Sequence, residues 1–140
     1  MTMSCEGSER NLTAKNQILT PAEWAVYECL WEQAPLTLTQ IANQLIERKG
    51  WSRSTGETMV RRMADKGLIR WEQGEKAKLY YPVIRREDAA LRETRSFLER
   101  VYHGSLGLMV SAVAEKETLS RSEIDELYAA LKKLEENCHD

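Results

Sequence analysis

Apolar residues in the first half of the chain recur at helical spacing and predict helices joined by short turns. The first is expected from Pro21 to about Gln33, after a capping box in which Thr20 and Glu23 satisfy each other's backbone N–H groups. A second is expected over residues 38–49, where Thr37 and Gln40 form another capping box and Gly50 follows. Their buried stripes are expected to contain Trp24, Tyr27, Leu30, Trp31, Ile41, Ala42, Leu45 and Ile46, with Val26 and Cys29 at one edge.

A third helix is expected over residues 53–66, with Ser52 as its N-cap and Gly67 just beyond its end. One side of this helix is apolar, while the other carries hydroxyl and guanidinium groups. Hydroxyls near a helix N-terminus can approach base edges and phosphates, and arginine can read guanine or bind a phosphate. This side is interpreted either as an ordinary solvated face or as a DNA-reading surface made of Ser54, Thr55, Thr58, Arg61 and Arg62.

After the third helix the pattern changes to a period of two, which predicts a β-hairpin. Residues 68–73 and 78–83 alternate apolar and polar side chains, and Gly74 lies in the turn between them. Taken alone, such a hairpin would be interpreted as a structural element with no role in binding. After three short helices it is typical of a winged helix-turn-helix, in which Lys76 and Lys78 are placed to contact DNA phosphates.

The rest of the chain is predicted to be helical, with a break at Gly104 and a third capping box formed by Ser120 and Glu123. Three short helices cannot easily bury their apolar stripes against one another, so we expect these helices to form a homodimer. The alternative is a monomer in which they pack back on the winged domain. The expected dimerisation residues are Leu98, Val101, Tyr102, Met109, Val113, Ile124, Leu127, Tyr128 and Leu131.

The fold class is therefore mostly α with a small β-hairpin wing. We expect a disordered tail over residues 1–17, a winged helix-turn-helix domain over 18–84, a helical dimerisation region over 85–136 and a flexible end over 137–140.

Charge is distributed unevenly along these 140 residues, although the net charge is only −2. From residue 51 to 86 nine basic residues stand against four acidic ones, whereas residues 87–140 carry seven basic and twelve acidic ones. The positive charge thus coincides with the expected third helix and wing, as in a protein in which one segment contacts phosphates.

Several classes of protein are disfavoured by composition. No stretch approaches the roughly 18 apolar residues of a membrane helix, and no signal peptide is evident, so we expect a cytoplasmic protein without membrane insertion. Three widely spaced cysteines indicate neither a disulfide framework nor a metal site. Neither a nucleophile with its base nor a metal site is evident, so no enzyme, cofactor or metal is expected.

The sequence resembles the penicillinase-repressor family of bacterial winged-helix regulators, to which BlaI-, MecI- and CopY-like proteins belong. The resemblance covers residues 18–136 and is carried by LTPAEWAVYECLW (19–31), WSRSTGETMVRRMADKGLI (51–69), YYP (80–82), FLERVYHGSLGLMV (97–110) and EKETLSRSEIDELYAAL (115–131). It implies a homodimeric repressor of transcription that binds a palindromic double-stranded DNA operator. It also implies DNA contacts from Ser54, Thr55, Thr58 and Arg62, with Lys76 and Lys78 in the wing; Gly56 departs from the β-branched residue usual there.

The resemblance also implies two routes of release. In BlaI- and MecI-like members a pathway from a membrane sensor protease leads to cleavage at an Asn-Phe bond, where this chain has Ala112 and Val113. Copper-responsive members end in a cysteine cluster, where this chain has only Cys138 and His139, too few for a closed soft-metal site. A winged-helix protein-interaction module without specific DNA binding remains the alternative function; its affinity for a partner would not fall steeply with salt.

Overall fold

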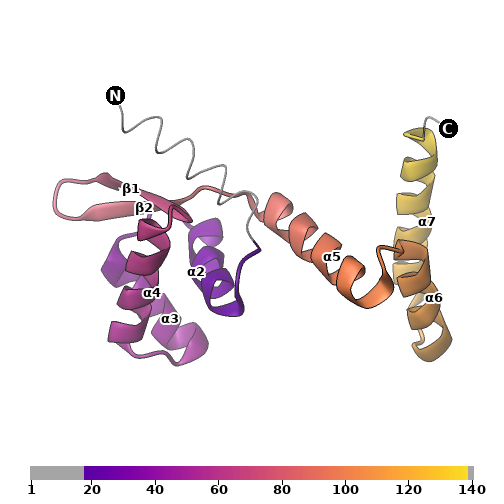
Figure 1. Cartoon of the computed structure of the whole chain (residues 1–140), viewed down its shortest axis with the longest axis horizontal. Helices are drawn as coiled ribbons and strands as arrows, with labels where there is room; N and C mark the ends of the chain where they lie inside the picture. Colours follow the sequence, from indigo (N-terminus) through magenta and orange to yellow (C-terminus); the bar gives the residue numbers. More distant parts are fainter. Residues whose placement is uncertain (1–17, 139–140) are drawn as a thin grey trace. The chain divides into compact units, whose positions relative to one another are not determined.

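The computed structural model describes residues 18–138, which form six helices and one β-hairpin (Figure 1). The expected disordered tail, residues 1–17, and the last two residues lie outside the described residues. The chain divides into two compact units, one ending at Ser96 and the other beginning at Phe97.

The helices of the first unit begin where the sequence supplies N-caps. They are α2 (Pro21–Glu32), α3 (Leu38–Lys49) and α4 (Arg53–Asp65). Both predicted capping boxes at the starts of α2 and α3 are present, and the hydroxyl of Ser52 accepts the backbone N–H of Thr55 at the start of α4. Gly67 follows α4 with a φ of 78°, a left-handed conformation that glycine adopts without steric cost.

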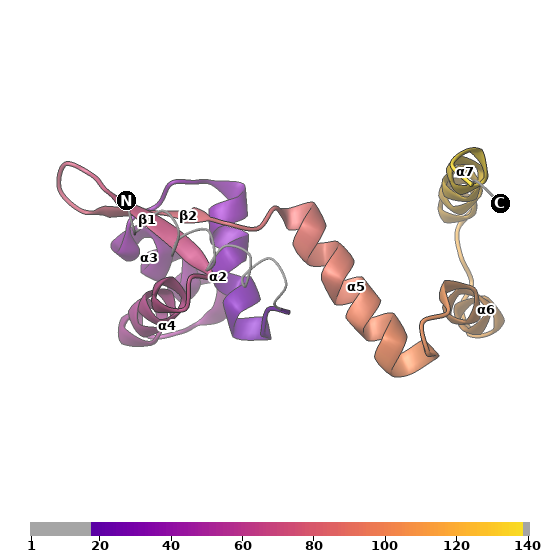
Figure 2. The ribbon, with the colours of Figure 1, turned by 45° about the horizontal axis from the view of Figure 1, so that its top comes forward.

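The hairpin consists of β1 (Ile69–Gln73) and β2 (Lys78–Pro82), paired antiparallel with Trp71 opposite Tyr80. Leu36, in the turn between α2 and α3, exchanges two backbone hydrogen bonds with Tyr80 and so anchors β2 on its other edge. The loop of the hairpin extends past the helices of this unit in both ribbon views (Figures 1 and 2). The predicted winged helix-turn-helix arrangement is confirmed.

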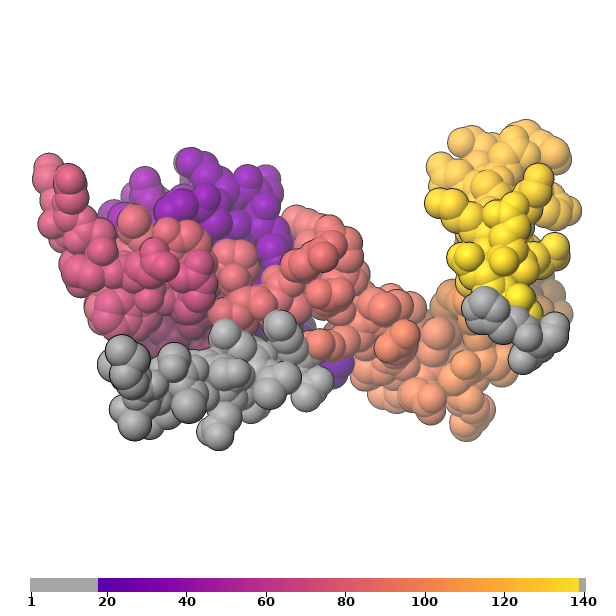
Figure 3. All heavy atoms as spheres, turned by 90° about the horizontal axis from the view of Figure 1, so that it is seen from above, coloured from indigo at the N-terminus to yellow at the C-terminus, as the bar shows by residue number. Residues whose placement is uncertain are grey.

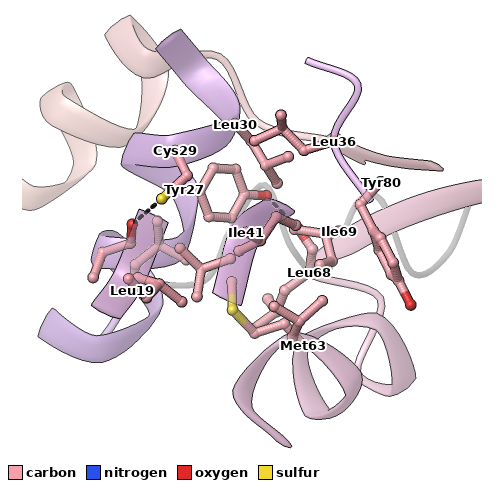
Figure 4. Close-up of a cluster of buried hydrophobic side chains, with 14 of the residues drawn as sticks. Leu19, Tyr27, Cys29, Leu30, Leu36, Ile41, Met63, Leu68, Ile69 and Tyr80 are labelled. Carbon is pink, nitrogen blue, oxygen red and sulfur yellow. Dashed lines mark hydrogen bonds between the residues drawn. The ribbon is translucent and has the colours of Figure 1, made fainter. Parts of the chain in front are cut away.

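The core of the first unit lies between α2, α3, α4 and the base of the hairpin (Figure 4). Its fully buried side chains include Tyr27, Leu30, Ile41, Leu45 and Met63. Cys29 packs among them as a small apolar residue, and burial raises the pKa of its thiol.

Three details differ from the sequence expectations. Ile46 lies in the last turn of α3 and is 40% exposed, so it is not part of the buried stripe. Trp24 and Trp31 are half-buried, since each keeps its indole N–H at the edge of the core to donate a hydrogen bond. At α7 the carboxylate of Glu123 contacts the Ser120 hydroxyl instead of the cap backbone, so the third capping box is incomplete.

The remaining helices are α5 (Arg86–Tyr102), α6 (Leu106–Lys116) and α7 (Arg121–Glu136). Helix α5 ends at Tyr102 and is followed by His103 and Gly104, both with positive φ, at the predicted break. No residue of α6 or α7 is fully buried, although both helices carry many apolar side chains. Among the described residues, no helix is both long and apolar enough to cross a membrane.

Candidate nucleic-acid interface

Helix α4 has a buried face and an exposed face. Gly56, Val60 and Met63 are buried against the core, which fixes the rotation of the helix about its axis. The side chains predicted to read DNA all lie on the exposed part of the helix surface: Ser54, Thr55, Thr58, Arg61 and Arg62. The structure therefore brings these predicted residues together on one solvent-facing surface.

Hydroxyl groups gather at the N-terminus of α4. The Ser52 hydroxyl lies 3.3 Å from that of Ser54 and 2.9 Å from that of Thr55. Next to them the guanidinium of Arg53 donates to the side-chain oxygen of Asn43 on α3, at 2.8 Å. Because these groups are exposed, they offer both hydrogen-bond donors and acceptors to a ligand at this end of the helix.

The two arginines of this face differ in their partners. The guanidinium of Arg61 lies 3.9 Å from the carboxylate of Glu57, one turn earlier, while its side chain stays 61% exposed. Within residues 18–138, Arg62 forms no ion pair. An exposed guanidinium without a carboxylate partner keeps its donors available for a phosphate or a guanine edge.

A groove lies between the wing, the start of α3 and the exposed face of α4. Its lining includes Thr37 and Thr39 at the start of α3, Arg61 of α4, and Lys78 and Tyr80 of β2. Burial raises the pKa of Tyr80, whose ring packs in the core while its hydroxyl points away from the other labelled side chains (Figure 4). Lys76 is exposed in the hairpin turn, which projects from the first unit in the space-filling view (Figure 3).

The base of the wing is fastened to α2 by one buried side chain. The hydroxyl of Tyr27 donates to the carbonyl of Leu68, just before β1, and accepts the backbone N–H of Val83, just after β2, at 3.4 Å. Burial raises the pKa of Tyr27 to about 12, because the phenolate would lose its hydration, and the backbone hydrogen bonds only partly oppose this. Tyr27 thus holds both ends of the hairpin against the helix that supports α4.

The expected dimerisation residues form exposed or half-exposed apolar surface. Leu127, Tyr128 and Leu131 of α7 are 41%, 66% and 55% exposed. Met109, Ile124, Leu127 and Leu131 line one apolar groove formed by α6 and α7, and Val113 lies in an adjoining one. Leu98 and Tyr102 of α5 are half-buried, and Val101 is 45% exposed.

The predicted site of cleavage lies within a helix. Ala112 and Val113 belong to α6, where Ala112 is half-buried and Val113 is 38% exposed. Cys138 is exposed, and His139 lies outside the described residues. Within residues 18–138 no three His, Cys, Asp or Glu side chains are grouped so as to hold a metal ion.

Sequence reasoning missed two features of this surface. Trp71 of β1 is 45% exposed and lies under the ammonium group of Lys78, 4.1 Å from its ring centroid. The alternation of the hairpin could have revealed this pair, since diagonal neighbours on one face of two paired strands come within reach of long side chains. The groove lined by Thr37 and Thr39 had no sequence signal, because it depends on how the wing packs on α3.

Comparison with known proteins places the chain in a family. The family model described as "Penicillinase repressor" matches residues 19–133. The methicillin resistance regulatory protein MecI of Staphylococcus aureus strain N315 is 30% identical over 119 residues, which cover 85% of this chain and 97% of MecI. The penicillinase repressor of Bacillus licheniformis is 31% identical over 113 residues, covering 81% of this chain and 88% of that protein.

A solved structure is also similar to part of the chain. The solution structure of the Bacillus licheniformis BlaI monomeric form in complex with the blaP half-operator aligns with a TM-score of 0.46 and 24% sequence identity, covering 51% of this chain and 90% of that one. From the family match and these two relatives, the chain belongs to the penicillinase repressor family, a family of transcriptional repressors rather than of enzymes.

Proposed function

We propose that this protein is a homodimeric, sequence-specific transcriptional repressor that binds a palindromic double-stranded DNA operator in the cytoplasm. The observation that carries the proposal is the exposed face of α4, on which hydroxyls and two arginines stand opposite a buried apolar face. A helix presented in this way by two supporting helices can enter the major groove. The related MecI and penicillinase repressor are named as regulatory proteins, which supports the same role here.

Each part of the surface has a distinct task in this proposal. Ser54, Thr55 and Thr58 approach base edges and phosphates, and Arg62 reads a guanine or binds a phosphate. Arg61 and the lysines of the wing, Lys76 and Lys78, neutralise phosphates beside the groove. The excess of positive charge between residues 51 and 86 supports these roles in binding DNA.

The apolar surface of α6 and α7 supports the proposed dimer. These helices bury none of their own residues, yet their groove is lined by Met109, Ile124, Leu127 and Leu131. Contiguous exposed apolar surface of this kind is typical of an interaction site, and a second copy supplies an identical, self-complementary one. A two-fold dimer would present two α4 helices to the two halves of a palindrome.

Release of the operator is proposed to act through the dimer. Cleavage between Ala112 and Val113, at the end of a pathway from a membrane sensor protease, would cut α6 within the apolar groove. Because a protease needs an extended substrate, α6 must first unfold locally around this bond. Loss of the interface would then separate the two α4 helices and weaken operator binding.

The test replaces Arg62 with Ala and measures binding to a duplex from the protein's own upstream promoter by fluorescence anisotropy. Loss of one guanine or phosphate contact by each chain is expected to weaken binding by about 1–3 kcal/mol per contact, while the dimer stays intact in sedimentation. The control is Arg121→Ala on α7, whose side chain is 80% exposed and pairs with Asp125. An affinity of Arg62→Ala equal to that of Arg121→Ala would remove Arg62 from the interface.

A further inference from the structure

The two faces of the wing carry different chemistry. Side chains alternate along paired strands, so cross-strand neighbours share a face. One face, called here the inner face because its base packs on the core, carries Ile69, Trp71, Gln73, Lys78, Tyr80 and Pro82. The outer face carries Arg70, Glu72, Leu79 and Tyr81.

Positive charge on the outer face is already paired. The guanidinium of Arg70 donates to the carboxylate of Glu72 at 2.9 Å, and its central carbon lies 4.1 Å from the ring centroid of Tyr81. A guanidinium held by both a carboxylate and an aromatic ring has to give up or share these contacts to bind a phosphate, so the outer face offers the less favourable phosphate site.

Positive charge on the inner face is held in another way. The ammonium of Lys78 lies 4.1 Å from the ring centroid of Trp71, and within residues 18–138 no carboxylate comes within ion-pair distance of it. The quadrupole of the indole attracts the ammonium without neutralising it. The ring therefore restricts where Lys78 points and leaves its full charge available to an anion.

The position that Trp71 gives to Lys78 lies on the groove that Arg61 of α4 also lines. Lys78 lines the same groove as Arg61 of α4 and the hydroxyl-bearing Thr39 of α3. Trp71 itself keeps 45% of its surface exposed on the same face. A DNA backbone lying along this groove would meet the inner face of the wing and not the outer one.

We infer that Trp71 is a positioning residue of the DNA interface, and that its indole holds the Lys78 ammonium against a backbone phosphate so that the wing binds DNA through its inner face alone. This rests on the proposed DNA-binding function and adds which face of the wing takes part. The ligand of the pair is a phosphodiester of duplex DNA.

The experiment measures promoter affinity at several salt concentrations for the full-length protein, four single variants and one double variant. Lys78→Met removes the charge, Trp71→Leu removes the ring but keeps apolar bulk, and Trp71→Phe keeps a ring. Arg70→Met is the matched control, because it removes one positive charge from the outer face of the same hairpin. The slope of log K against log salt reports the number of phosphates neutralised, about 0.9 for each.

Lys78→Met should lower this slope by about 0.9 for each wing that engages DNA, and Trp71→Leu should lower it towards the same value. Trp71→Leu should weaken binding about threefold at low salt, whereas Trp71→Phe should restore most of the affinity and slope. Combining Trp71→Leu with Lys78→Met should cost no more than Lys78→Met alone, because the two side chains act as one unit. Arg70→Met should leave the slope unchanged.

The inference is overturned if Trp71→Leu keeps the wild-type slope, if its effect adds to that of Lys78→Met, or if Arg70→Met lowers the slope as much as Lys78→Met. These outcomes leave the proposed function intact, since wild-type protein still binds its promoter. A wild-type protein that binds no DNA overturns both proposals.

Discussion

Replacement of Gly56 by Ala should stabilise the protein. Gly56 is buried in α4 without a positive φ, so its backbone is compatible with alanine. An added Cβ would lie 3.4 Å from both the Cα of Ala42 and a methyl of Leu45, and 3.6 Å from the Cβ of Ala42. These are ordinary van der Waals contacts. Removing a glycine from a helix interior gains roughly 1 kcal/mol, and the new methyl adds packing at little cost.

The expected gain in the free energy of unfolding is therefore about 1 kcal/mol, or a rise of about 4 °C in melting temperature. Urea unfolding followed by circular dichroism measures it, with an unchanged m-value. The control is Gly50→Ala: the space around Gly50 is open, but its φ of 70° is left-handed, so alanine should cost about 1 kcal/mol there. Destabilisation by Gly56→Ala would show that α3 and α4 pack too closely for a methyl group. Because Gly56 faces α3, promoter affinity should not change.

Two further predictions concern the base of the wing and the dimer. Tyr27→Phe leaves the carbonyl of Leu68 and the N–H of Val83 without this partner and should cost about 1–3 kcal/mol in urea unfolding. Because the pKa of Tyr27 is raised to about 12 in the folded protein, against about 10 in the unfolded chain, this shift stabilises the folded state fully only below pH 10. The stabilisation is lost as the pH rises from 10 to 12. The stability of Tyr27→Phe should therefore fall less steeply over this range than that of the wild-type protein. Replacing Leu127 and Leu131 with Asp places charges in the apolar groove and should yield monomers in sedimentation velocity that bind the promoter weakly. If the variant remained dimeric, α7 would not form the dimer interface.

Local signals in the sequence were sufficient to locate the helices. Thr20, Thr37 and Ser52 each supply a hydroxyl to the backbone N–H three residues on, and each begins the helix predicted from it. Gly67 ends α4 because a left-handed residue is needed there. These interactions span one helical turn, so their geometry is implied by the order of residues alone.

Features that depend on packing between distant segments were not predictable in the same way. The hydrogen bonds of Tyr27 to Leu68 and Val83 connect positions more than 40 residues apart. Helical periodicity places Ile46 on the apolar stripe, but its exposed fraction of 40% depends on which other elements pack against this end of α3.

The candidate site was partly predictable for the same reason. Spacing placed Ser54, Thr58 and Arg61 on one face of α4, since that depends only on the helix. The groove that joins Arg61 to Lys78 depends on the docking of the wing, and the stacking of Lys78 on Trp71 depends on the register of the hairpin. The groove follows from neither composition nor periodicity, and the Trp71–Lys78 pair follows from the alternation of the strands only once their register is known.

The most direct test of the central claim is binding of the full-length protein to its own upstream promoter DNA and to scrambled DNA of equal length, each at two salt concentrations. The repressor account predicts tighter binding to the promoter, a stoichiometry of two chains per site, and a steep loss of affinity as salt rises. Equal, weak binding to both duplexes, or promoter binding that does not respond to salt, would contradict it.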